Sequence, residues 1–455
     1  MSHLIPSNPE STSQPELRRE LSLLDATMIN VGSMIGSGIF LVPTTIALYL
    51  HSTSLVILVW TVGGIVSLFG ALTIAELGAM MPHAGGPYVY LRRAYGPLWG
   101  FLYGWSAFAV IMTAAISALA VAFAAYLAYF FPMSPLQIKL VAIACILLLT
   151  AVNCFGVRYS ALVQNGFTFL KIGALGLLVL LGFLLSGGSA TNFEPVFPEK
   201  ISSSLIGVFG LAMIAVLWSY DGWIEITYAA GEVRDPARTV HRSLIISTLL
   251  VIVVYVLINL AYIYVLSLEN VAHSTLVASD AAMVILGPVG ASFVAAAVVI
   301  STFGANNGFI FTGARIYYAM AREGLFLRSF ANVHPKFQTP IPSLIGQGIW
   351  SSLLVLSGTY EELTTYVVFV SWLFYAMSCG AVFILRKRSP LQDRRPESPR
   401  SYKTWGYPYT PLVFILFALL LVANTAVENP VASAIGLGLV ASGVPAFWFW
   451  ARNQS

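Results

Sequence analysis

The 455-residue chain carries very little charge, because only 9% of its residues are Asp, Glu, Lys or Arg while 58% are hydrophobic. Soluble domains contain roughly a quarter charged residues, so this composition excludes a water-soluble protein. The chain has only three cysteines, Cys145, Cys154 and Cys379, and six scattered histidines. No disulfide framework or metal-ligand spacing results, and we expect neither a metal nor a cofactor. A membrane-embedded enzyme would need clustered His, Cys or carboxylates, which are lacking.

Long apolar runs recur along the whole sequence, and each is about long enough to cross the hydrocarbon core of a bilayer. They are too long and too uniformly apolar for the strands of a membrane β-barrel. We therefore predict an all-α integral membrane protein with about twelve transmembrane helices. The predicted segments are 24–50, 55–79, 97–130, 138–154, 160–186, 204–231, 243–267, 290–320, 341–357, 363–385, 410–427 and 431–450.

Basic residues indicate how the chain is oriented in the membrane. Of its 23 Lys and Arg residues, only Lys139 and Lys200 lie in the loops of one side, and nearly all the others lie in the opposite loops and the two tails. Loops rich in Lys and Arg remain cytoplasmic, so both termini are predicted inside a multi-pass protein of the plasma (inner) membrane. The net charge of +4 thus reflects topology and the lipid bilayer, and indicates no nucleic-acid partner. Residues 1–20 are predicted to be a disordered cytoplasmic tail, and 389–409 a charged cytoplasmic loop.

Two of the predicted helices are interrupted near their centres. The first contains "INVGSMIGSGIF" (29–40), with several Gly and Ser residues, and the sixth contains "VLWSYDGWIEITYAAGEV", with Asp221 and Gly222 midway. Interrupted segments at corresponding positions of two halves point to a transporter site at the membrane midplane. We therefore predict an inverted-repeat core over 21–388, with repeats 21–188 and 200–388. Two additional helices and a short tail would occupy 410–455.

A broken helix frees N–H donors at the start of its second half and carbonyl acceptors at the end of its first. The N–H groups can bind a carboxylate, and the carbonyls can accept hydrogen bonds from an ammonium group or coordinate sodium. One site with both matches a zwitterionic amino acid. Gly32 and Gly36 also form a small-xxx-small packing motif, so helix packing is the alternative for the first interruption. The charged Asp221 in the second interruption favours binding.

These residues resemble the amino acid–polyamine–organocation (APC) superfamily, and within it the L-type amino-acid transporter branch. The resemblance extends from about Leu21 to Arg388. It implies a five-plus-five inverted-repeat (LeuT-like) fold with helices one and six unwound, and alternating access. The motifs that carry it are "VGSMIGSGIF", "PHAGGPYVYLRRAYGPLWGFLYGW" (82–105), "WSYDGW" with "GEVRDPAR" (218–238), and "STFGANNGFIFTGARIYYAMAREG" (301–324).

The resemblance also implies which residues bind substrate. The substrate carboxylate would meet the N–H groups around Gly36, Ser37 and Gly38 in the first helix. Its amino group would meet carbonyls near Met34 in the first helix and near Trp218 and Ser219 in the sixth. Trp218 stands where the family has an aromatic gate, and Asp221 where members line the side-chain pocket. Ile224 follows Trp223 where many animal members have Asn, which leaves side-chain specificity open. The implied substrate-binding residues are Met34, Gly36, Ser37, Gly38, Trp218, Ser219 and Asp221.

Lys171 lies about 16 Å along the fifth helix, too deep for its side chain to reach water. A buried ammonium is unfavourable unless it is paired or hydrated. A structural pair with Asp25 or Glu76 is one explanation. In the resembling family, a lysine here fills the volume that sodium occupies in sodium-coupled relatives. We therefore expect Lys171 to lie between helices one, five and eight and to make transport independent of sodium.

Other polar residues have competing interpretations. Asp221 could attract a cationic side chain, bind a coupling proton, or hydrogen-bond backbone donors freed by the break. Glu225 could face the same cavity, but polar packing with helix ten is the simpler expectation. Tyr262 in helix seven could approach the site and take part in gating, although aromatic residues in membrane helices usually pack.

A secondary amino-acid carrier accounts for these features better than other classes of membrane protein. No helix shows the continuous polar stripe of a channel, and no P-loop for ATP is present. Sodium-independent exchange of amino acids is our first expectation, and proton-coupled symport is the alternative. In animal L-type carriers, a cysteine between helices three and four tethers a heavy chain. The corresponding loop, "FFPMSPLQ", lacks cysteine, so no disulfide-linked heavy chain is expected.

Overall fold

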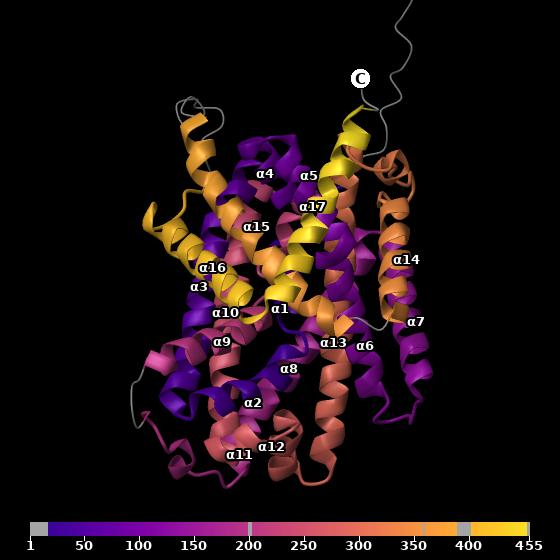
Figure 1. Cartoon of the computed structure of the whole chain (residues 1–455). Helices are drawn as coiled ribbons and strands as arrows, with labels where there is room; N and C mark the ends of the chain where they lie inside the picture. Colours follow the sequence, from indigo (N-terminus) through magenta and orange to yellow (C-terminus); the bar gives the residue numbers. More distant parts are fainter. Residues whose placement is uncertain (1–16, 199–202, 358–359, 389–401, 453–455) are drawn as a thin grey trace, which may run out of the picture.

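The structure is a computed structural model that describes residues 17–198, 203–357, 360–388 and 402–452. These residues form a bundle of α-helices (Figure 1). The α-helices are α1 (Leu23–Met34), α2 (Gly38–Leu50), α3 (Thr53–Met80), α4 (Pro87–Tyr95), α5 (Pro97–Ser106), α6 (Met112–Leu127), α7 (Pro135–Cys154), α8 (Val157–Leu185), α9 (Ser203–Ser219), α10 (Pro236–Leu266), α11 (Leu268–His273), α12 (Val277–Leu286), α13 (Val289–Arg322), α14 (Ile341–Ser357), α15 (Tyr360–Arg388), α16 (Tyr409–Glu428) and α17 (Pro430–Arg452). A π-helical turn, η1 (Ala107–Ile111), joins α5 to α6.

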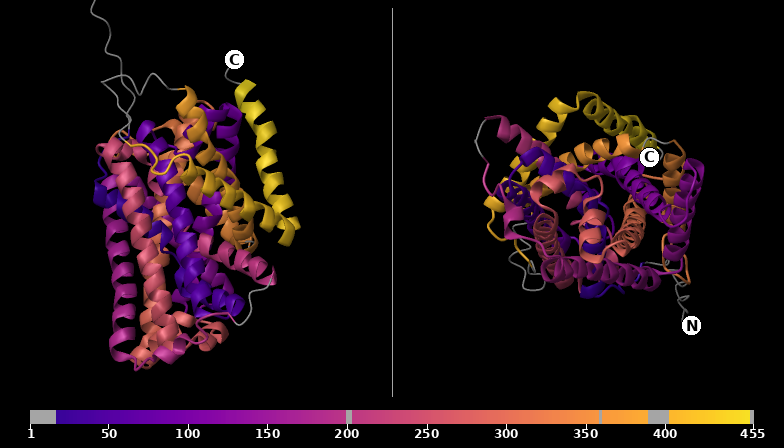
Figure 2. Two further views of the ribbon diagram at one scale, coloured as in Figure 1. Left: turned by 90° about the vertical axis from the view of Figure 1, so that its left-hand side faces the viewer. Right: turned by 90° about the horizontal axis from the view of Figure 1, so that it is seen from below.

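Local sequence signals fix several helix starts. Ser22 and Asp25 form a reciprocal capping box at the start of α1, and Ser134 and Gln137 form another at α7. Each box satisfies backbone donors that the first helical turn leaves unpaired. Proline begins α4, α5, α7 and α10, where its missing N–H costs nothing. The long helices α8 and α10 run side by side (Figure 2).

Among the described residues, nine helices are long and apolar enough to cross a membrane, and the bent pair α1–α2 makes a tenth span. The chain is therefore a multi-pass membrane protein, as predicted. The predicted sixth and ninth segments correspond to α9 and α14, which are apolar but shorter. The total of twelve spans and the inverted repeat remain predictions.

The first predicted helix is broken where expected. Its first part, α1, ends at Met34, its second part, α2, begins at Gly38, and their axes differ by 44°. The carbonyl end of α1 and the N-terminus of α2 therefore both face the middle of the bundle.

The sixth predicted helix departs from expectation. The helix α9 ends at Ser219, but no α-helix continues to residue 231 as predicted. Two short 3₁₀ turns follow instead, η3 (Glu225–Thr227) and η4 (Ala230–Glu232). Gly222 adopts a φ of +108°, and the N–H of Ile226 donates to Asn30 Oδ1 at 2.8 Å rather than within a helix. Tertiary hydrogen bonds thus replace helical ones in this segment.

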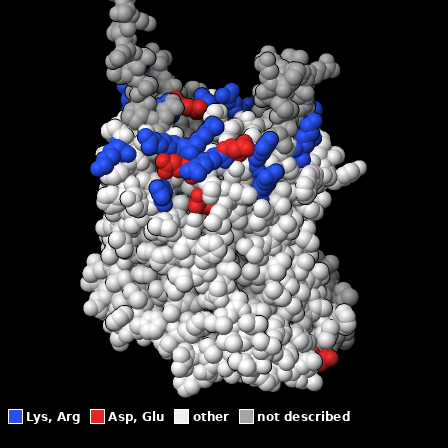
Figure 3. All heavy atoms as spheres, turned by 180° about the vertical axis from the view of Figure 1, so that it is seen from behind, with Lys and Arg blue, Asp and Glu red and all other residues white. Residues whose placement is uncertain are grey.

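Charged side chains gather at one end of the molecule (Figure 3). Among the described residues, four ion pairs lie toward this end: Arg92 with Glu323, Glu76 with Arg386, Glu232 with Arg315, and Asp235 with Arg238. The segment before α1 is tied to the η4 turn by a parallel bridge between Leu21 and Val233. Helices and turns from both predicted repeats are therefore joined at the charged end.

Candidate functional site

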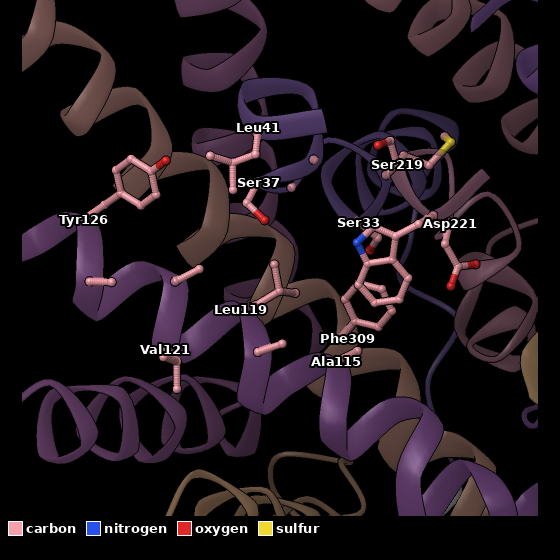
Figure 4. A pocket seen from close by; sticks show the side chains of 17 residues that line it. Ser33, Ser37, Leu41, Ala115, Leu119, Val121, Tyr126, Ser219, Asp221 and Phe309 are labelled. Carbon is pink, nitrogen blue, oxygen red and sulfur yellow. The ribbon is translucent and has the colours of Figure 1, made fainter. Parts of the chain in front are cut away.

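A cavity of about 370 Å³ opens at the break between α1 and α2. Its walls come from this break, from the end of α9, from one side of α6 and from Phe309 of α13 (Figure 4). Of the nine site residues predicted from sequence, seven line this cavity, whereas Lys171 and Tyr262 do not. The seven are Met34, Gly36, Ser37, Gly38, Trp218, Ser219 and Asp221.

The N-terminus of α2 offers backbone donors to the cavity. Its N-cap residue, Ser37, makes no side-chain capping bond. The N–H groups of Ser37, Gly38 and Ile39 form no hydrogen bond with any other residue that the structure describes. Gly36 differs from the prediction, because its N–H already bonds the carbonyl oxygen of Met34 at 3.0 Å. A helix N-terminus with free donors is suited to a carboxylate.

Glycine at position 38 allows the two broken segments to meet. A Cβ atom there would lie 2.7 Å from Oγ and 3.3 Å from Cα of Ser219. Gly222 meets α1 in the same way, because its Cβ would lie 2.8 Å from the backbone nitrogen of Met34. These close approaches require Gly.

The carbonyls predicted to hold an amino group already have protein donors. The Tyr255 hydroxyl on α10 bridges the breaks, at 2.8 Å from the Met34 oxygen and 2.9 Å from the Ser219 oxygen. The Trp218 carbonyl accepts the N–H of Asp221 at 3.1 Å. A carbonyl oxygen has two lone pairs, and Met34 and Ser219 share the single hydrogen of Tyr255. Trp218 and Ser219 therefore each retain at least one free lone pair, whereas Met34, which also accepts from Gly36, has the least remaining capacity. The available acceptors therefore lie at the end of α9.

Asp221 lines the cavity, and one of its carboxylate oxygens already accepts hydrogen bonds within the protein. Its Oδ1 accepts the N–H of Gly222 at 3.0 Å and the hydroxyl of Tyr375, on α15, at 2.9 Å. This agrees with the expectation that the carboxylate satisfies a donor freed by the break. Its Oδ2 makes no hydrogen bond with a described residue, so it can still meet a ligand.

Lys171 does not line the cavity, and its side chain stabilises the end of α1 by hydrogen bonds. Its side chain is fully buried, and its Nζ donates to three carbonyls: Gly32 at 2.9 Å, Ile35 at 2.7 Å and Ser301 at 2.8 Å. The ammonium thus lies between α1, α8 and α13, the helices that we expected. Its three N–H donors are all used.

The alternative of an ion pair for Lys171 is wrong. Asp25 Oδ1 accepts from Asn165 at 2.6 Å, and Glu76 pairs with Arg386. The side chain of Glu225 hydrogen-bonds Thr312 of α13, and from the predicted tenth helix, α15, Tyr375 interacts with it electrostatically. Tyr262 is buried in α10 and does not line the cavity, and its hydroxyl has no hydrogen-bond partner among the described residues.

Sequence reasoning missed the wall contributed by α6. This wall is made mainly of alanines and includes Ala115, Ala118, Leu119, Val121, Ala122, Ala125 and Tyr126. Nothing distinguishes such a stripe from ordinary helix packing when only the sequence is read. Tyr255 was missed for the same reason, because one tyrosine in an apolar helix gives no sign that its hydroxyl bridges two breaks.

Comparison with known proteins agrees with this geometry. The serine/threonine exchanger SteT of Bacillus subtilis (strain 168) is 31% identical over 447 residues, which cover 98% of this chain and 99% of the relative. The human large neutral amino acids transporter small subunit 2 is 34% identical over 460 residues, covering 97% of this chain and 84% of the relative. The mouse b(0,+)-type amino acid transporter 1 is 33% identical over 420 residues, covering 91% and 84% respectively.

The sequence model of the family described as amino acid permease matches residues 21–446. The match confirms the predicted resemblance to the APC superfamily and its L-type branch, and with it a transporter rather than an enzyme. Because the match spans nearly the whole bundle, including both breaks and the α6 wall, the chain belongs to the amino acid permease family.

Proposed function

We propose that the protein is a sodium-independent exchanger of L-amino acids that works by alternating access in the plasma membrane, with both termini cytoplasmic. The observation that carries this proposal is the cavity at two unwound segments, with free N–H donors on α2 and carbonyl acceptors at the end of α9. An amino acid presents a carboxylate and an ammonium group to complementary partners in such a cavity.

Lys171 supports independence from sodium. Its ammonium contacts carbonyls on both α1 and α13, where freed backbone oxygens would otherwise be available to a cation. The positive charge is covalently attached and uses all its donors within the protein. A sodium ion would have to replace those contacts, so we expect transport to proceed without it.

The position of the cavity supports an outward-facing conformation. Its α6 wall runs from Ala115 to Tyr126, toward the end of α6 that lies away from the charged end of the bundle. At the charged end, Arg92 with Glu323 and Glu232 with Arg315 join separate elements. Alternating access would require these contacts to separate while the α6 side closes.

Exchange is favoured over symport by the relative that is named an exchanger, SteT, which matches almost the full chain. A second relative is named a small subunit. The loop between α6 and α7 here contains no cysteine, so we propose that this chain works without a disulfide-linked heavy chain. The alanine wall and Asp221 fit both small neutral and cationic amino acids.

Reconstituted proteoliposomes test this proposal. Vesicles preloaded with unlabelled amino acid should take up labelled amino acid, whereas empty vesicles should not, and replacing external sodium with choline should leave the rate unchanged. A panel of internal amino acids would define the substrate range. Uptake into empty vesicles driven by an inward proton gradient would support the symport alternative, and uptake that rises with a sodium gradient would contradict the proposed role of Lys171.

A further inference from the structure

Glu225 is a buried carboxyl group that the proposed substrate site does not use. It lies on the η3 turn, one turn beyond Asp221, and only 1% of its surface is exposed. It is not among the residues that line the cavity. Of the described residues, only Thr312 on α13 forms a hydrogen bond with the Glu225 side chain, and no described Lys, Arg or His forms an ion pair with it.

Thr312 has two acceptors within reach of its hydroxyl group. The Thr312 hydroxyl lies 2.9 Å from the carbonyl oxygen of Gly308, four residues earlier in α13, and it also contacts Glu225 Oε2. A hydroxyl has one hydrogen and cannot donate it to both. Threonine in a helix commonly donates to the carbonyl of residue i−4. The single hydrogen of Thr312 can satisfy only one of these two oxygens at a time, so a carboxylate at Glu225 would have one shared donor, whereas a carboxyl group could itself donate to the Thr312 oxygen.

Arg315 is one turn further along α13, but it is not available to Glu225. Its Nε and one terminal nitrogen donate to the two carboxylate oxygens of Glu232 at 2.7 and 3.0 Å, and both side chains of that pair are fully buried. This cation, one turn from Thr312 along α13, is therefore already neutralised by another acid.

The other groups around Glu225 supply no positive charge. From α1, Asn30 accepts the N–H of Ile226, and α10 brings Ser247 to Asn30. The titratable groups that interact with Glu225 are one acid and several phenols: Asp221, Tyr103 of α5, Tyr228, Tyr317 of α13 and Tyr375 of α15. An isolated buried carboxylate is strongly disfavoured, and two neighbouring carboxylates do not both ionise readily.

We propose that Glu225 is a proton-binding site of the transport cycle, and this inference rests on the proposed transport function. The carboxyl group holds its proton while the charged end of the bundle is closed. When that end opens, the O–H bond breaks and the proton passes to cytoplasmic water, leaving the carboxylate. Return to the closed conformation requires one proton to be taken back from the cytoplasm, so a complete exchange cycle moves no net proton.

The location of Glu225 links the proton to this movement. The η3 turn lies in the segment between α9 and α10, and the same segment is joined to the chain before α1 at Leu21 and Val233. The N–H of Leu21 and the N–H of Glu20 both donate to the carbonyl of Glu232 in this junction. Separation of the junction would admit water to the segment that carries Glu225. Ionisation would then favour the open form, because a hydrated carboxylate is no longer penalised by burial.

This proposal predicts a dependence of exchange on internal pH. With external pH fixed, exchange by the wild-type protein should fall by up to about tenfold for each unit that internal pH rises above the titration point of the open form. Changing external pH alone should have little effect. Wild-type exchange that is indifferent to internal pH between about pH 6 and 8 would overturn the proposal without any variant.

Two variants identify the responsible group. Glu225→Gln keeps a donor for Thr312 and cannot release a proton, so exchange should become independent of internal pH. Glu428→Gln is the matched control, because Glu428 is exposed at the end of α16 and should keep the wild-type profile. A Glu225→Gln protein that keeps the wild-type profile, or an Asp221→Asn protein that alone loses it, would overturn the assignment to Glu225.

If Glu225→Gln folds but does not transport, infrared spectroscopy can still detect whether Glu225 is protonated in the wild-type protein. The wild-type and Glu428→Gln proteins should show the carbonyl band of a protonated carboxyl group at neutral pH, and Glu225→Gln should lack that band. A band of unchanged strength in Glu225→Gln would contradict the proposal. Absence of exchange by the wild type at every pH would contradict the proposed function instead.

Discussion

The Lys171 ammonium lies 2.7 Å from the carbonyl oxygen of Ile35, the C-cap residue directly after α1. Ser301 Oγ donates to the same oxygen at 2.9 Å. The last carbonyls of α1 are therefore held by side chains of α8 and α13 rather than by a further helical turn. This arrangement stabilises the break and leaves the N-terminus of α2 facing the cavity.

Replacing Lys171 with methionine, which has similar volume and no charge, tests this arrangement. Hydrogen bonds from a charged donor contribute about 1.5–3 kcal/mol each, so losing them should reduce exchange by at least about tenfold and lower the melting temperature. Exchange assays and thermal unfolding in detergent would measure both effects. Lys139→Met is the control, because Lys139 lies near the start of α7, away from the cavity, and donates to the carbonyl oxygen of Leu356 at 3.1 Å. Equal rates for the two variants would contradict a special role of Lys171.

Tyr255→Phe should weaken substrate binding. The change removes the hydroxyl that joins the carbonyls of Met34 and Ser219, and each hydrogen bond contributes about 0.5–1.5 kcal/mol. We expect the apparent KM for exchange to rise by about three- to tenfold. Tyr262→Phe on the same helix removes a hydroxyl without a partner among the described residues and should behave as wild type. A large effect of Tyr262→Phe would instead support the gating role predicted for Tyr262.

Two glycines of the first break should respond differently to alanine. Gly38→Ala places a Cβ 2.7 Å from Ser219 Oγ, whereas Gly36→Ala places one 3.5 Å from the Leu119 side chain, an ordinary contact. Overpacking costs about 1–3 kcal/mol, so Gly38→Ala should be less stable and nearly inactive. Gly36→Ala should fold normally and lose affinity only because the methyl group enters the cavity. Melting temperature and exchange rate together distinguish the two, and equal stability would contradict the close approach at Gly38.

Asp221→Asn separates substrate selection from structure. Asparagine retains an acceptor for Tyr375 and Gly222, so the protein should remain folded. A charge-assisted hydrogen bond is about twice as strong as a neutral one, and we expect uptake of lysine or arginine to fall about tenfold relative to alanine or serine. Competition between labelled and unlabelled amino acids would measure the ratio. An unchanged ratio would mean that the carboxylate serves only the break.

The pair between Glu232 and Arg315 should be sensitive to single substitution. Removing one partner of a buried ion pair leaves an uncompensated charge and costs about 3–5 kcal/mol, so Arg315→Met should unfold at a markedly lower temperature. The double variant Arg315→Met with Glu232→Leu removes both charges and should recover much of the loss. Thermal unfolding of the single and double variants checks this, and a double variant no more stable than Arg315→Met would refute it.

The sequence carried enough information for the central features of the site and not for its walls. The first break follows from Gly36, Ser37 and Gly38, because these residues have low helix propensity inside an otherwise apolar run. The depth of Lys171 follows from the rise per residue of its helix, and its place near α1 is what the family resemblance implies. Its partners could not, because carbonyl oxygens leave no trace in a sequence.

The structure of the segment after Ser219 could not be predicted from the sequence. Its apolar composition predicted a second helical half, but hydrogen bonds to residues far away in the chain, such as Asn30 with Ile226, override local preference. The alanines of α6 form a wall only because the broken segments lie opposite them. The repeats 21–188 and 200–388 remain a prediction from sequence.

A positive charge fixed to α8 differs from a dissolved ion in that it never leaves. The three hydrogen bonds of Lys171 form without any ion binding from solution, so they do not depend on a cation gradient across the membrane. A carrier with this covalently attached charge has no cation gradient at this position that could drive uphill transport of its substrate. It can exchange amino acids between the two sides of the membrane, and the relative concentrations on the two sides set the direction of net transport.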